Sequence, residues 1–187
     1  QSEVPGDDWA AWETAGSPVE LTGEWQIEFV QGGPTLPAGW RTKHLASWTE
    51  LGAEEAQSFA GTARYTTTFD APQPSAGNWR LDLGRVCQSA RVRLNGQDLG
   101  TVFLPPFRVP LGQVKAKGNV LEVEVTNVAA NRIRDLDRRQ VKWQNFHDIN
   151  FVNLEYKKFD ASKWPLTDSG LLGPVQLVPL RKKTLRR

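Results

Sequence analysis

The chain has 187 residues with 39% hydrophobic and 24% charged side chains, which suits one globular all-β domain with a full core. Its formal net charge of +2 is too small to favour nucleic acid as a partner. One cysteine excludes an intrachain disulfide, two histidines without a Cys/His cluster disfavour a zinc site, and no apolar run reaches the ~18 residues of a membrane span.

The first half of the chain predicts short strands separated by turn residues. Residues 24–30 alternate between apolar and polar side chains, which places Trp25, Ile27 and Phe29 on one face of a strand. Residues 62–69 are β-branched and aromatic, which also favours a strand. The elements expected here are an extended lead-in over 1–20, strands over 24–30 and 42–48, a short helix over 49–58, and strands over 62–69 and 79–83.

The second half contains the strongest local signal, Asn95-Gly96 between two alternating segments. Such a pair is typical of a type I′ hairpin turn, because both central residues of that turn adopt positive φ. A proline-bearing bend is expected before Phe107, with the Phe107 ring in the core. The strands expected in this half cover 86–94, 98–103, 108–114, 120–128 and 174–180, with 108–114 at a sheet edge.

Many short strands and almost no helix predict an all-β fold, an antiparallel β-sandwich or jelly roll. We expect a single domain over 1–187, with its core at about 21–180 and a solvated basic tail at 181–187. One long irregular insertion, 131–168, is expected before the last strand. It is too long for an ordinary connection, and its many aromatic residues argue against disorder.

Six motifs occur in a characteristic order along the chain. They are SWTE at 47–50, FAGTARYTTTF at 59–69, LDLGRV at 81–86, ARVRLNGQDLGTVFLPPFRV at 90–109, GNVLEVEVTNVAANRI at 118–133 and SGLLGPVQL at 169–177. This order resembles the sugar-binding-type, galactose-binding-like β-sandwich of glycoside hydrolase family 2, in the version at the C-terminal end of family 106 α-L-rhamnosidases. The resemblance covers roughly 21–180 and departs from the family pattern after Asn131-Arg132, where the rhamnosidase pattern is short.

The resemblance implies a non-catalytic carbohydrate-binding domain of a polysaccharide-degrading glycoside hydrolase, because the family's catalytic carboxylates lie in a separate barrel. It implies two partners, a plant or microbial polysaccharide with rhamnose or uronate units and the catalytic domain of the same polypeptide. It also implies a secreted or periplasmic location. No signal peptide is visible, and the absence of methionine fits either a mature secreted protein or a piece of a longer polypeptide. Neither nucleic acid nor a membrane is expected as a partner.

Two other functions stay open from the residues. One is a purely structural domain that supports a catalytic barrel. The other is a small stand-alone glycosidase or lyase that uses carboxylates of the 131–168 loop. Glycoside hydrolysis needs two carboxyl groups about 5 Å apart for retention or about 6.5–9.5 Å apart for inversion. Asp148 and Glu155 are weak candidates for this chemistry, and no residue is assigned as catalytic.

The insertion over 131–168 holds the candidate sugar-contacting residues. A guanidinium donates two parallel hydrogen bonds to a uronate carboxylate or to vicinal hydroxyls, and an exposed indole stacks on the C–H face of a sugar ring. Amides and carboxylates complement sugar hydroxyls. The alternative is a salt-bridged loop that packs over the sandwich. The candidates are Arg132, Arg134, Asp135, Arg138, Trp143, Asn145, His147, Asp148, Asn150, Tyr156 and Trp164.

Three further features have simple structural interpretations. Cys87 lies in an alternating segment, which favours a buried structural thiol over a nucleophile. Trp9 and Trp12 are expected to pack against the sandwich rather than to stack on a ligand. No cofactor is expected, although the acidic residues of the insertion and Asp7-Asp8 leave a structural Ca²⁺ ion open.

Overall fold

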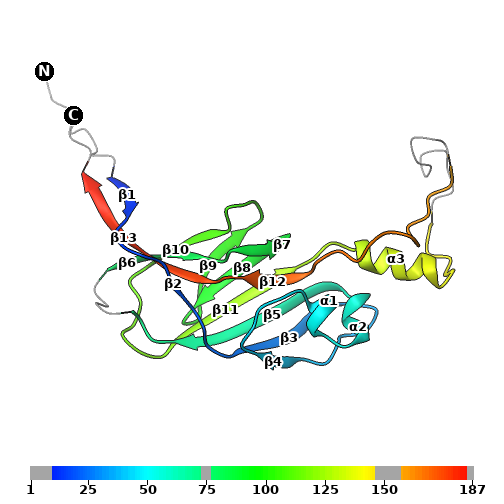
Figure 1. Cartoon of the computed structure of the whole chain (residues 1–187), viewed down its shortest axis with the longest axis horizontal. Coiled ribbons are helices and arrows are strands. Elements are labelled where there is room, and N and C mark those ends of the chain that lie inside the picture. Colours follow the sequence, from blue (N-terminus) through cyan, green and yellow to red (C-terminus); the bar gives the residue numbers. More distant parts are fainter. Residues whose placement is uncertain (1–9, 73–76, 146–156, 185–187) are drawn as a thin grey trace, which may run out of the picture.

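The structure, a computed structural model, describes residues 10–72, 77–145 and 157–184. Two antiparallel sheets contain most of the strands, and one hydrophobic core cluster draws side chains from both of them (Figure 1). The expected all-β sandwich is therefore confirmed. None of the helices in the described part of the chain has the length and apolarity of a membrane span.

The smaller main sheet has five strands in the order β1-β13-β6-β10, with β2 also paired to β13. The lead-in that the sequence predicts as extended thus supplies two strands, both of which pair with the chain's closing strand. The predicted edge strand is confirmed, because β10 pairs with β6 at the end of this order. The strands are β1 (Ala10–Thr14), β2 (Val19–Glu20), β6 (Asn78–Asp82), β10 (Arg108–Gly112) and β13 (Gln176–Thr184).

The larger sheet has six strands in the order β4-β3-β5-β11-β8-β9. Its central strands alternate between core and surface, as in β11, where every second side chain is buried. Its members are β3 (Trp25–Gly33), β4 (Trp40–Thr42), β5 (Ala60–Phe69), β8 (Ser89–Leu94), β9 (Gln97–Val102) and β11 (Asn119–Thr126). A separate short pair joins β7 (Arg85–Cys87) to β12 (Gly170–Gly173).

The Asn-Gly hairpin has the predicted geometry, with φ of 52° at Asn95 and 82° at Gly96. The same asparagine also ties the hairpin to β11. Its amide oxygen accepts a hydrogen bond of 3.0 Å from the Val120 N–H, and its own N–H donates to the Val120 carbonyl at 2.8 Å. Its side-chain amide donates to the Asn119 Oδ1 at 3.2 Å. The two turns therefore support each other across the edge of the sheet.

The strand predicted over 42–48 is wrong. Strand β4 ends at Thr42, and Ser47 instead begins α1 (Trp48–Leu51), because its hydroxyl accepts a hydrogen bond of 3.3 Å from the Thr49 N–H. The short helix predicted over 49–58 is confirmed as two single turns, the second being α2 (Glu54–Gln57). The strand predicted over 86–94 is divided at Gln88, whose φ of 95° interrupts the ladder between β7 and β8.

The core matches most of the predicted burial. Trp25 and Phe107 are buried, as predicted. Cys87 is also buried, and that burial raises the pKa of its thiol, which disfavours the reactive thiolate. Trp12 lies on β1 with 50% of its surface exposed, so it packs against the sandwich with half of its surface at most. Trp9, Asp7 and Asp8 lie outside the described residues.

The outward face of the six-stranded sheet carries a cross-strand charge cluster. Arg64 on β5 and Arg93 on β8 both approach the Glu124 carboxylate on β11, at 2.8 Å and 3.1 Å. Burial by itself would raise the pKa of Glu124, but the hydrogen bonds from both arginines outweigh burial and lower it. Ionised Glu124 therefore stabilises the folded sheet.

Acid titration is expected to reveal this contribution. The folded-state pKa of Glu124 lies below its ordinary value of 4.5, so its stabilisation is complete above pH 4.5 and is lost as the pH falls through the folded-state value. The free energy of unfolding of the unmodified domain should therefore fall more steeply below pH 4.5 than that of Glu124→Gln. Urea unfolding at a series of pH values measures this difference. Parallel pH profiles for the two proteins would contradict the assignment.

Candidate functional site

The insertion begins with a helix, α3 (Ala130–Arg138), so the prediction that 131–168 is irregular is wrong over its first turns. Ile133 and Leu136 lie one turn apart, and Arg138 in the last turn interacts favourably with the helix dipole. Figure 1 shows α3 at one end of the molecule, beyond the strands and opposite to the end where β1 lies. We call residues 130–145 and 157–168 the α3 segment.

Two asparagines, the buried Asn131 and the half-buried Asn127, fasten the α3 segment to the sandwich. The Asn131 side chain is 2% exposed and forms two hydrogen bonds with the Thr167 backbone, accepting from its N–H at 2.8 Å and donating to its carbonyl at 2.7 Å. Asn127 donates to the Ser169 hydroxyl and to the Phe59 carbonyl, both at 3.0 Å. These bonds hold the two ends of the insertion together at the margin of the core.

Most charged residues of α3 have a partner within the insertion. Asp135 accepts hydrogen bonds from the Arg139 Nε–H at 3.0 Å and from Arg132 at 3.5 Å. Arg134 donates from Nε to the Trp164 carbonyl at 2.6 Å. Within the described ranges, Arg138 makes no ion pair and is exposed to solvent. The salt-bridged alternative therefore fits part of the helix, and Arg138 is the exception.

A groove of about 590 Å³ separates α3 from α2. We call it the α2–α3 groove. One wall carries Glu54 and Glu55 with the amide of Gln57 and the hydroxyl of Ser58, and the other carries the α3 arginines. In the part of the chain that the structure describes, no ion pair bridges these two walls. The lining residues are Pro34, Glu54, Glu55, Gln57, Ser58, Asn131, Arg134, Asp135, Arg138 and Arg139.

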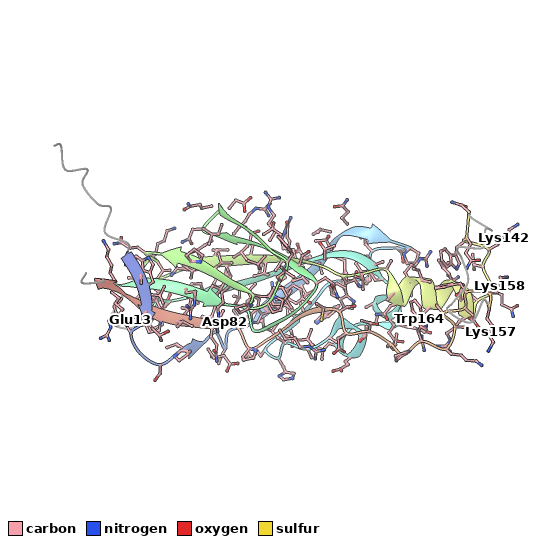
Figure 2. All side chains as sticks on the ribbon, turned by 90° about the horizontal axis from the view of Figure 1, so that it is seen from above. Glu13, Asp82, Lys142, Lys157, Lys158 and Trp164 are labelled. Carbon is pink, nitrogen blue, oxygen red and sulfur yellow. The ribbon has the colours of Figure 1, made fainter. Side chains whose placement is uncertain are left out.

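The aromatic residues of the segment pack against each other rather than into the groove. The Phe159 ring contacts Trp143 and Trp164 edge-on, with centroid distances of 6.1 Å and 5.5 Å. Asp137 holds this cluster, accepting from the Trp143 indole N–H at 2.6 Å and from the Ala161 N–H at 2.7 Å. Figure 2 shows Trp164 beside α3, and Lys142, Lys157 and Lys158 at the far end of the segment.

The predicted site residues divide into three groups. Arg134, Asp135 and Arg138 meet in the α2–α3 groove, and Arg132 lies beside it through its bond to Asp135. Trp143 lines a second hollow of about 590 Å³ with Phe159 and Asp160, Trp164 packs on Phe159, and Asn145 is exposed. Five predicted residues lie outside the described part of the chain: His147, Asp148, Asn150, Glu155 and Tyr156.

The sequence prediction omitted the opposite wall of the groove, which α2 supplies through Glu54, Glu55 and Gln57. No local signal could have found these residues, because α2 and α3 are far apart in the sequence and meet only after the sandwich has formed. It also omitted Asp137 as the residue that holds Trp143. Among the described residues, no three His, Cys, Asp or Glu side chains gather in a way that could hold a metal ion.

Comparisons with known proteins identify the type of domain. No protein-family model matches the chain. A Formosa agariphila protein named "Putative beta-glucuronidase" is 36% identical to it over 188 aligned residues, which are 90% of this chain and 16% of that protein. The chain therefore spans about a sixth of the length of the curated relative it matches.

Solved structures of glycosidases contain a domain similar to this chain. A rhamnosidase from Novosphingobium sp. PP1Y is 28% identical with a TM-score of 0.64, over 90% of this chain and 15% of the rhamnosidase. A Bifidobacterium dentium beta-glucuronidase at 18% identity (TM-score 0.61) and a GH2 beta-galacturonidase from Eisenbergiella tayi at 20% identity (TM-score 0.54) share the fold, each over 89% of this chain. The chain is a β-sandwich domain of the type found in glycoside hydrolase family 2 enzymes and in this rhamnosidase.

Proposed function

We propose that this chain is a non-catalytic, carbohydrate-binding accessory domain of a polysaccharide-degrading glycoside hydrolase. The observation that supports this most is the α2–α3 groove, whose facing walls carry hydrogen-bond acceptors at Glu54 and Glu55 and donors at Arg134 and Arg138. A sugar hydroxyl both donates and accepts, so a row of hydroxyls satisfies both walls at once. The groove therefore combines hydrogen-bond donors and acceptors, as recognition of a polyhydroxylated chain requires.

The relatives support the accessory role. They are glycoside hydrolases, and the chain aligns with 15–30% of the length of the rhamnosidase and the glucuronidase. We infer that its natural partner is the catalytic domain of the same polypeptide, and that this enzyme works outside the cell or in the periplasm, where polysaccharides are found. The rhamnosidase relative supports a rhamnose-containing polysaccharide as the substrate class.

Catalysis by this chain has weaker support. A general acid in glycoside hydrolysis needs a raised pKa. Among the described residues, the carboxyl groups whose pKa the structure shifts are Asp98, Glu124 and Asp160. Hydrogen bonding lowers the pKa of Asp98 and Asp160, and in Glu124 burial opposes the hydrogen bonds from Arg64 and Arg93, which still lower the pKa. Asp148 and Glu155 lie outside the described residues, so their suggested catalytic role stays a prediction.

Arg138→Gln is expected to weaken binding of neutral oligosaccharides about fivefold, because one net hydrogen bond contributes on the order of 1 kcal/mol. Arg138 makes no ion pair with another described residue, so this change should lower the stability of the domain by less than about 1 kcal/mol, the contribution of its charge at the C-terminal end of α3. Isothermal titration calorimetry and saturation-transfer NMR measure the effect with rhamnose-, galactose- and xylose-containing oligosaccharides at millimolar concentration.

The matched control is Arg181→Gln on β13, which removes an exposed arginine at the opposite end of the molecule. It should bind as the unmodified domain does. If no neutral oligosaccharide binds at millimolar concentration, or if both variants weaken binding equally, the groove is not a sugar site.

A second candidate function is support of a catalytic domain by direct packing. Three large apolar side chains of the α3 segment are exposed, Val141 at 41% and Trp164 and Leu166 at 40% each. Burying such side chains against a neighbouring domain would be favourable. If this is the function, Trp164→Ser in the full-length enzyme would lower its melting temperature, while the same change in the isolated domain would have a much smaller effect.

A further inference from the structure

The outward face of the six-stranded sheet contains a polar hollow that is separate from the α2–α3 groove. It has a volume of about 530 Å³ and lies over β3, β5, β11, β8 and β9. We call it the arginine hollow. Its lining residues are Val30, Gln31, Thr62, Arg64, Ser89, Arg91, Arg93, Thr101, Glu124 and Thr126.

The charged groups of the arginine hollow are unusually sheltered for the outer face of a sheet. The side chains of Arg64, Arg93 and Glu124 are 35%, 24% and 15% exposed. Arg64 donates to the Glu124 Oε1 from both Nε and Nη2, at 3.1 Å and 2.8 Å, and Arg93 approaches the same oxygen at 3.1 Å. One carboxylate oxygen therefore orients two guanidinium groups before any ligand arrives.

The residues that line the hollow include three arginines and one carboxylate, Glu124. Arg91 is held from outside the lining by Asp98, through an Nε–Oδ2 bond of 3.0 Å. Glu28 and Glu122 lie opposite Arg64 and Arg93 on the neighbouring strands, and both interact electrostatically with Arg64, although neither lines the hollow. The lining itself is therefore rich in guanidinium donors, while the sheet around it also carries carboxylates.

Hydroxyl groups surround these arginines. Thr62 and Thr126 are hydrogen bonded to each other at 2.8 Å across β5 and β11, and Ser89 and Thr101 lie on the next two strands. Because the groups project from paired strands, their spacing is set by the sheet ladder rather than by a loop. The hollow combines fixed hydroxyls with planar cationic donors.

We propose that the arginine hollow binds a uronate unit of an acidic polysaccharide. Guanidinium groups donate paired hydrogen bonds to a planar carboxylate, and the surrounding threonine and serine hydroxyls complement the sugar's own hydroxyls. This site is distinct from the α2–α3 groove, shares no lining residue with it and does not depend on it. The domain then holds an acidic chain on its sheet face.

The test uses tetragalacturonate and a glucuronic-acid-bearing xylo-oligosaccharide, each beside its carboxyl-reduced form. At least one acidic ligand is expected to bind at least tenfold more tightly than its reduced form, and this difference should shrink when salt rises from 50 to 500 mM, since screening weakens exposed charge interactions. Amide shifts in ¹H–¹⁵N spectra should concentrate at Thr62, Ser89 and Thr126. Equal affinity for acidic and reduced ligands overturns the proposal.

Variants separate this site from its alternatives. Arg93→Gln should weaken uronate binding at least fivefold. The triple variant Arg64→Gln, Arg93→Gln and Glu124→Gln removes the two guanidinium groups together with the carboxylate that they share, so no member of this cluster is left unpaired, and it should abolish the preference for the acidic ligand. Arg41→Gln is the matched control, because it removes an arginine of the same sheet, paired with Glu24, that does not line the hollow.

The two proposals can fail independently. Uronate binding that is lost in Arg138→Gln but kept in Arg93→Gln would move the acidic ligand to the α2–α3 groove and overturn the present inference. Uronate binding that depends on Arg93 would support the arginine hollow even if every neutral oligosaccharide failed to bind. Amide shifts confined to α2 and α3 would likewise contradict uronate binding in the arginine hollow.

Discussion

Gly170→Ala is expected to destabilise the domain by about 4 kcal/mol, because strained backbone and an overfilled core act at the same position. Gly170 has a φ of +104°, where an L-residue is strained. An added Cβ would also collide with the Tyr65 hydroxyl and lie 3.0 Å from the Trp48 ring. Both neighbours are fully buried, so neither can move aside easily. Urea unfolding followed by tryptophan fluorescence measures the loss.

Gly100→Ala is the matched control. Its φ of +100° is nearly the same, but nothing lies within 4 Å of the added Cβ. This change should cost about 1–2 kcal/mol from backbone strain alone. The difference between the two variants isolates the packing of β12 against Tyr65, whose hydroxyl also accepts a hydrogen bond of 3.1 Å from the Leu171 N–H. Equal losses in the two variants would show that β12 packs more loosely than the structure has it.

Asn131→Ala is expected to cost about 2 kcal/mol, because it removes two hydrogen bonds between a buried side chain and the Thr167 backbone and leaves the Thr167 N–H without its partner. The loss should be local. Hydrogen exchange at the Thr167 amide should accelerate strongly, while exchange in β11 should change little. The α2–α3 groove should then lose sugar binding along with its wall, since Asn131 holds the base of α3.

Asn145→Ala is the control for this prediction, because Asn145 lies in the same segment and its side chain is exposed. It should change neither the stability nor the exchange rates. If Asn131→Ala unfolds the sandwich and the α3 segment in one step, without faster local exchange, the segment is an integral part of the core rather than an attached unit.

Much of the sandwich could be predicted from neighbouring residues alone. The alternation in 120–128 specifies one buried face, and β11 has that face. The Asn95-Gly96 turn requires positive φ at both residues, and both have it. These properties depend on a few adjacent side chains, so no knowledge of the rest of the chain is needed to infer them.

The errors occurred where a distant contact outweighs the local pattern. The segment before Trp48 resembles a weak strand, but the Ser47 hydroxyl also accepts from the Ser169 N–H at 3.0 Å, which draws this segment out of the sheet. The helix α3 has Ile133 and Leu136 one turn apart among charged residues, a short helical pattern that the sequence prediction overlooked. Its position depends on Asn131 reaching Thr167 across the insertion.

The candidate sites also combine features that local sequence predicts with contacts that only the fold creates. Charge and aromatic content identified the insertion, including Arg134 and Arg138, as the region to examine, but not the acidic wall at Glu54 that faces them. The arginine hollow was not predicted, although Arg91, Arg93 and Glu124 stand at alternating outward positions in the sequence. Alternation shows that these side chains share a face with solvent, and strand order decides which of them meet.

The sequence by itself determined the fold class, the hairpin at Asn95-Gly96, the core face of each long strand and the resemblance to sugar-binding sandwiches of glycoside hydrolases. Only the tertiary structure decided which polar residues converge. The alternation of apolar and polar residues is visible within a short stretch of sequence, and it shows which face of a strand is buried. The pairing of β5 with β11 and of α2 with α3 brings together residues that are far apart in sequence, and that pairing exists only once the core has closed.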